Sequence, residues 1–198
     1  MRLFLALELE PATADDIHAA VEPLRPLGAD RVTEAAAPAR ALDWVPANKL
    51  HLTLKFLGGA EGGRVEQLVR AADHVAARHR PFELTLGGVG AFPNFRRPRV
   101  VWLGVESEPR LELLHHDVEV AAADAGYELD GRPFRPHITL ARVREHLPVE
   151  RARTLARTAR AISYSAVVFV DRLTLFDSAT GESGAHYRQL HVATLGGR

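Results

Sequence analysis

Two short stretches with the same pattern constrain this chain more than any other feature of its sequence. They begin at His51 and His137, and each reads His, apolar, Thr, apolar. Strict alternation of this kind is typical of a half-buried β-strand, on which residues i and i+2 share one face. We therefore predict that each histidine faces outward together with the threonine two positions later, Thr53 or Thr139, above a buried apolar residue.

The segments around the motifs alternate between strand-like and helix-like patterns. Strands are expected at residues 2–10, 50–57, 82–86, 100–105, around 137–142, 166–176 and 187–195, and helices at 11–27, 64–79, 110–125 and 149–162. This order predicts an α+β fold in which residues 1–198 form one domain of two pseudo-symmetric lobes. Each lobe would be an antiparallel sheet backed by helices, with the two motif strands side by side at a central groove. Residues 28–42 have no firm period and are expected to form a loop.

Composition and charge exclude several classes of protein. Lys plus Arg and Asp plus Glu both number 25, so the net charge is zero and a broad basic face for duplex nucleic acid is not expected. The absence of cysteine excludes disulfides, thiolate metal sites and a cysteine nucleophile. The N-terminal segment meets acidic residues too early for a signal peptide, and no apolar run is long enough for a membrane helix. We expect a cytoplasmic protein with no membrane partner.

The residue types in the paired motifs suit phosphodiester chemistry. A neutral imidazole can take a proton from water while a protonated one gives a proton to the leaving oxygen. Histidine is the side chain whose ordinary pKa allows both forms near neutral pH. The threonine hydroxyls can donate hydrogen bonds to non-bridging phosphate oxygens. We predict His51 and His137 as the general acid and base, and Thr53 and Thr139 as the phosphate clamp.

Other catalytic arrangements fit the sequence less well. A metal site would need a third ligand, and neither motif carries an Asp or Glu in phase, so we expect neither a metal nor another cofactor. No Gly-x-Ser-x-Gly elbow supports a serine nucleophile. The neighbouring His115 and His116 lie on a predicted helix and are interpreted as surface or structural residues.

Phe56 and Arg142 each stand five positions after a motif histidine. An odd offset on an unbroken strand would turn both away from the catalytic face, so either the strands bulge or end there, or these residues belong to the other face. If they face the site, an aromatic ring and a guanidinium could clasp a nucleobase above the phosphate. Lys55 is in phase with His51 and Thr53, which would place it at the groove or in solvent.

With these residues in view, the chain resembles the two-histidine (2H) phosphoesterases, in particular the RNA 2′,3′-cyclic phosphodiesterases that are also described as 2′-5′ RNA ligase-like proteins. The resemblance covers nearly the whole chain and is carried by four stretches. They are residues 2–7 (RLFLAL), 50–58 (LHLTLKFLG), 90–93 (GAFP) and 132–142 (RPFRPHITLAR). The last fits the extended pattern His-x-Thr-x-x-Arg.

The resemblance implies a bilobal α+β fold and metal-independent opening of 2′,3′-cyclic phosphates at RNA ends to 2′-phosphates. It implies His51 as acid and His137 as base, although the sequence leaves the reverse order open. It also implies that Arg142 and Phe56 contact the nucleotide, and that the enzyme can join ends by 2′-5′ ligation. We expect a monomer whose partner is an RNA or oligonucleotide end with a 2′,3′-cyclic phosphate. The alternatives are a non-catalytic nucleotide or RNA-end binder that uses the same groove, and a protein-interaction module.

Overall fold

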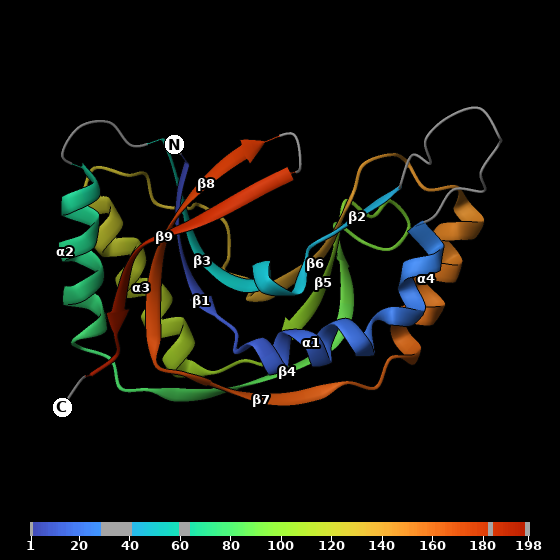
Figure 1. Cartoon of the computed structure of the whole chain (residues 1–198), viewed down its shortest axis with the longest axis horizontal. Helices are drawn as coiled ribbons and strands as arrows, with labels where there is room; N and C mark the ends of the chain where they lie inside the picture. Colours follow the sequence, from blue (N-terminus) through green and yellow to red (C-terminus); the bar gives the residue numbers. More distant parts are fainter. Residues whose placement is uncertain (1, 29–40, 60–63, 182–183, 197–198) are drawn as a thin grey trace.

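The computed structural model describes residues 2–28, 41–59, 64–181 and 184–196. Figure 1 shows the chain as a long curved sheet with helices at both ends. The strands are β1 (Arg2–Glu8), β2 (Leu42–Trp44), β3 (His51–Gly59), β4 (Phe82–Phe92), β5 (Val100–Val105), β6 (His137–Val143), β7 (Ser165–Val170), β8 (Arg172–Gly181) and β9 (Gly184–Thr194). The helices are α1 (Pro11–Ala20), α2 (Arg64–Ala76), α3 (Pro109–Asp124) and α4 (Val149–Ala161), with 3₁₀ turns η1 (Glu22–Gly28) and η2 (Ala47–Lys49).

The strands form a sheet in the order β7-β4-β5-β6-β3-β1-β8-β9, and β2 adds to β6. All of these pairings are antiparallel. The motif strands β3 and β6 are neighbours in the middle of the sheet and are joined at one register pair, Leu52 opposite Ile138. One half of the sheet therefore consists of β3 with β1, β8 and β9, and the other consists of β6 with β5, β4, β7 and the added strand β2. The predicted α+β class is confirmed, while the division into two lobes stays a prediction.

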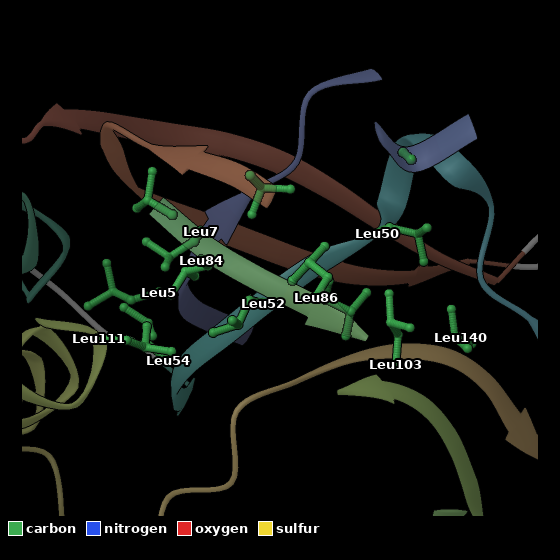
Figure 2. Packing of buried hydrophobic residues seen from close by; sticks show 14 of the residues in the cluster. Leu5, Leu7, Leu50, Leu52, Leu54, Leu84, Leu86, Leu103, Leu111 and Leu140 are labelled. Atoms are coloured by element: carbon green, nitrogen blue, oxygen red, sulfur yellow. The ribbon is translucent and has the colours of Figure 1, made fainter. Parts of the chain in front are cut away.

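The helices cover the face of the sheet that carries the motif leucines and isoleucine. Helices α2 and α3 pack against each other and against β3, β8 and β9, while α4 packs on β4 and η1 (Figure 1). Figure 2 shows the buried leucines of β1, β3, β4, β5 and β6 gathered together, with Leu111 of α3 among them. Because Leu52, Ile138 and their neighbours fill this core, the residues that alternate with them lie on the opposite face.

Two strand predictions need correction. The expected strand 166–176 is two strands that break at Asp171, because β7 pairs with β4 whereas β8 pairs with β1 in the other half of the sheet. Residues 178–181, which follow the expected strand 166–176, also belong to β8, which continues to Gly181 and pairs antiparallel with β9.

The expected strand 82–86 does not end at Gly87 and Gly88 but continues to Phe92. Gly88 adopts a φ of +70°, which side chains disfavour, and the register with β5 shifts between Leu86 and Val89. The glycines therefore form a bulge rather than a strand end, and β4 reaches the level of the second motif. Of the predicted loop 28–42, residues 29–40 lie outside the described residues, and Leu42 begins β2.

Candidate active site

The pairing of β3 with β6 places the two motifs opposite each other. Since Leu52 lies opposite Ile138 in an antiparallel pair, the flanking residues of the two strands also face each other. His51 stands across from Thr139, and Thr53 stands across from His137. All four side chains are half-buried, whereas the apolar residues between them are buried. The structure thus brings together the four residues that the sequence singled out.

Both imidazoles are held by the same hydrogen bond. Nδ1–H of His51 donates to the carbonyl of Lys49 (2.8 Å), and Nδ1–H of His137 donates to the carbonyl of Arg135 (2.7 Å). A carbonyl oxygen only accepts, so the proton of each neutral ring lies on Nδ1 and the lone pair lies on Nε2. Each motif therefore presents Nε2 as the atom that can accept or deliver a proton.

Aromatic rings fix the plane of each imidazole. The His51 ring lies 5.0 Å from Phe4 and meets Tyr187 edge-on at 5.3 Å, measured between ring centroids. The His137 ring meets Phe92 edge-on at 4.9 Å. Trp102 lies beyond it at 6.5 Å. Reasoning from sequence did not assign these four rings to the site, because they come from strands that become neighbours only when the sheet forms.

Both motif strands bulge at the same point, which settles how Phe56 and Arg142 are oriented. Along β1, Phe4, Ala6 and Glu8 alternate on one face and lie opposite Phe56, Thr53 and His51, so one residue of β3, Leu54, is extra. The offset of five positions therefore returns Phe56 to the face of His51.

The second motif repeats this geometry. Along β5, Val100, Trp102 and Gly104 lie opposite Arg142, Thr139 and His137, and Leu140 is the extra residue. Arg142 therefore shares the face of His137. The six residues that begin at each histidine also have the same burial pattern in β3 and β6. In both strands the fourth and fifth of these residues are buried in succession, which marks the bulge.

Phe56 and Arg142 are both available for contact with a ligand. The Phe56 side chain is 69% exposed although it is large and apolar, and its ring lies 6.1 Å from Phe4. Arg142 is exposed, and Asp43, its partner residue on β2, forms an ion pair with Arg144 instead (2.7 Å).

The bulge corrects the expectation for Lys55. This residue does not face the groove or solvent but is turned to the helix side of the sheet, where it is 5% exposed. Its Nζ donates to Glu119 of α3 (2.8 Å) and to the carbonyl of Glu128 (2.7 Å). Lys55 is therefore a buried structural cation.

The electrostatic surroundings lower the pKa of His51. Burial is the main cause, and the positive charges of Arg142 and His137 act in the same direction. The hydrogen bond to the Lys49 carbonyl and the negative charge of Glu8 oppose this shift. Before a substrate binds, His51 is thus biased toward its neutral form.

A cavity of about 1030 Å³ adjoins His51. Its lining comes from the end of β1, the start of α1, η2 and the β8–β9 hairpin, and includes Glu8, Lys49, Tyr187 and Gln189. His137 does not line this cavity, so the open space lies on one side of the paired motifs.

The ring of His115 is stacked on Phe134 at 3.8 Å, which agrees with the structural role predicted for it.

Within the described ranges, no group of three or more His, Asp or Glu side chains is arranged as metal ligands. Among the helices of these same ranges, none combines the length and the apolar character that a membrane span requires.

Comparisons with known proteins agree with this geometry. The sequence profile of the 2'-5' RNA ligase superfamily matches residues 13–182. A protein of Archaeoglobus fulgidus named RNA 2',3'-cyclic phosphodiesterase is 35% identical over 150 residues, which are 75% of this chain and 76% of that protein. A protein of Geobacillus stearothermophilus with the same name is 44% identical over 99 residues; these are 50% of this chain, and the match spans 32% of that relative. The crystal structure of E. coli LigT complexed with 3'-AMP is similar with a TM-score of 0.72 and 29% identity, covering 98% of this chain and 97% of that one.

Proposed function

Because the chain belongs to the 2'-5' RNA ligase superfamily, we propose that it hydrolyses 2′,3′-cyclic phosphates at RNA ends and leaves 2′-phosphates. The family predicted from the sequence is thereby confirmed. The names of the relatives, RNA 2',3'-cyclic phosphodiesterase, support the enzyme class and the substrate. In this proposal the RNA end is the partner, and no metal or other cofactor takes part.

The proposed reaction is a proton relay across the two motifs. One neutral imidazole takes a proton from water at Nε2 as the water oxygen forms a bond to phosphorus. The other imidazole, protonated at Nε2, gives its proton to the 3′ oxygen as the bond between phosphorus and that oxygen breaks. The product carries a 2′-phosphate and a 3′-hydroxyl. His51 is assigned as the acid and His137 as the base.

The remaining motif residues would bind the substrate. Each threonine shares a strand with one histidine and lies opposite the other, so the hydroxyls of Thr53 and Thr139 can donate to the non-bridging phosphate oxygens of a substrate bound there. The guanidinium of Arg142 can bind phosphate or stack on a base, and the exposed ring of Phe56 can cover the other face of the base.

The observation that carries this proposal is the matched pair of imidazoles, each with Nδ1–H on the carbonyl two residues before it and Nε2 left for the reaction. The test is turnover of a 2′,3′-cyclic nucleotide in the presence of a chelator, with the product identified by ³¹P NMR. His51→Ala and His137→Ala should each lower kcat by orders of magnitude. His116→Ala, an exposed helix residue away from the motifs, is the matched control.

The same experiment separates the alternatives. Binding of the nucleotide without turnover would identify a non-catalytic RNA-end binder, and activity lost with the chelator would require a metal. A protein-interaction module would leave the cellular activity unchanged when both histidines are replaced. Ligation is the same transfer with a 5′-hydroxyl of RNA in place of water, so we propose that excess 5′-hydroxyl RNA yields 2′-5′ linked products.

We also propose that the protein acts as a monomer in the cytoplasm, within one domain formed by residues 1–198. Support for the monomer comes from the motifs, since both histidines and both threonines come from one chain. Light scattering on the purified protein at assay concentration tests the oligomeric state.

A further inference from the structure

The two halves of the site differ in the residue that lies opposite each histidine on the outer neighbouring strand. Opposite His51 on β1 is Glu8, whereas opposite His137 on β5 is Gly104. Opposite residues of an antiparallel pair point to the same face, so Glu8 shares the face of His51. We propose that Glu8 is a positioning residue whose carboxylate offsets part of the effect of burial on His51 and so enables His51 to carry the proton that it donates. This inference rests on the proposed function.

Glu8 is held in place at both carboxylate oxygens. The hydroxyl of Thr174 donates to Oε2 (2.7 Å), and the side-chain amide of Gln189 donates to Oε1 (2.6 Å). Thr174 has no exposed surface, so this anchor is rigid. Both partners are neutral, although the charge of Glu8 also acts on Arg172. Glu8 and His51 also line the same cavity.

The side of His137 has no room for an equivalent carboxylate. A Cβ atom at Gly104 would lie 2.6 Å from the carbonyl oxygen of Gly87 and 3.4 Å from the Trp102 ring. The first contact is with backbone, which cannot move aside as a flexible side chain would. The packing of β4 against β5 thus keeps the position opposite His137 without a side chain, and the asymmetry is part of the fold.

The other charged and titratable groups near His51 make the role of Glu8 distinct. Arg142 and His137 on β6 lower the pKa of His51, and burial lowers it further. The cavity that adjoins His51 is also lined by Lys49, Arg172, His186 and Tyr187. Glu8 is the carboxylate whose charge raises the pKa of His51.

Three further carboxylates, Glu10, Asp15 and Asp171, line the same cavity, and two of them, Glu10 and Asp171, are paired with Arg172 at 3.0 and 2.8 Å. The charges of these two are therefore compensated within the cavity wall, whereas Glu8, which lies opposite His51, accepts its hydrogen bonds from neutral donors.

The test is Glu8→Gln, which keeps the shape of the side chain and removes its charge. The titration of His51 is followed by NMR of its ring Cε1–H, and kcat and KM for a 2′,3′-cyclic nucleotide are measured from pH 5 to 9. We expect the pKa of His51 to fall, which lowers the fraction of His51 that is protonated near neutral pH. The alkaline limb of the kcat profile should move the same way, with KM nearly unchanged, and Glu8→Asp should recover part of both shifts.

A matched control and a second variant complete the experiment. Glu10→Gln removes a carboxylate from the same cavity wall and should leave the titration of His51 in place. Gln189→Lys changes an exposed residue, so it does not threaten folding, and its ammonium beside Glu8 should lower the pKa of His51 as Glu8→Gln does.

An unchanged His51 titration in both Glu8→Gln and Gln189→Lys would overturn the inference, and so would an equal shift in Glu10→Gln. The inference would also be overturned if Glu8→Gln moved the acidic limb of the kcat–pH profile instead of the alkaline limb, because His51 would then be the base. If the wild type turns over no cyclic phosphate and the NMR shift is still observed, the proposed function fails and the pairing of Glu8 with His51 stands.

Discussion

Replacement of Lys55 by methionine should strongly destabilise the fold, because it would leave a buried carboxylate without its cation. Lys55 is 5% exposed and Glu119 is 7% exposed, with 2.8 Å between Nζ and Oε2. After the change, Glu119 would keep the backbone N–H of Asp130 as its donor, and the carbonyl of Glu128 would lose its partner. Loss of one partner of a buried ion pair costs about 3–5 kcal/mol. For a chain of this size that is a fall in Tm of roughly 6 to 20 °C.

The assay is urea and thermal unfolding followed by circular dichroism. Arg153→Met is the matched control, since it removes an ion pair of the same 2.8 Å length between side chains that are 73% and 81% exposed. Such a pair contributes about 0–1 kcal/mol. The double variant Lys55→Met/Glu119→Leu should be more stable than Lys55→Met alone, because no unpaired charge stays buried. A Tm within 2 °C of the wild type for Lys55→Met would refute the reasoning.

Three further predictions concern the site. Thr53→Ala and Thr139→Ala should each reduce kcat/KM by the equivalent of about 2–4 kcal/mol if each hydroxyl donates to the phosphate in the transition state, which steady-state kinetics measures. Burial lowers the pKa of His51 in the native state below its ordinary value of 6.5. The unfolded chain therefore binds this proton at a higher pH than the native state does. The free energy of unfolding consequently decreases as the pH falls from about 6.5 through the lowered pKa. His51→Asn should therefore lose less stability than the wild type between pH 7 and 5 in urea unfolding. Gly104→Ala should destabilise the fold by about 1–3 kcal/mol through its contact with the carbonyl of Gly87, and an unchanged unfolding midpoint would contradict the overlap.

The parts of this fold that sequence reasoning recovered are those governed by local periodicity. The motif strands, the strand β1 and the helices α2, α3 and α4 all follow from apolar residues that recur at one strand or helix face. The place of each strand in the sheet is not a local property. The break at Asp171 follows from pairing with two distant partners, β4 and β1, and no residue near 171 reveals which strands those are.

The same limit applies to the site. The four motif side chains could be predicted, because each His and Thr pair sits within one alternating strand. Phe4 and Phe92 could not, since their contact with the imidazoles depends on β1 and β4 reaching the level of the motifs. A partial signal existed for Phe4, because buried leucines on either side of it place it on the opposite face of β1.

The bulges explain why both motifs carry a functional candidate at an odd offset from the histidine. With Leu54 and Leu140 as extra residues, the fifth position returns to the catalytic face, while the fourth is turned into the core. In β6 the fourth position is the small Ala141, whereas in β3 it is Lys55, which holds the carbonyl of Glu128 in the segment leading to His137. One irregularity in β3 thus places Phe56 on the face of His51 and turns the adjacent Lys55 to the helix side, where it binds the carbonyl of Glu128. The two motif strands are therefore connected on the helix side, through Lys55 and the segment before His137, as well as through their pairing in the sheet.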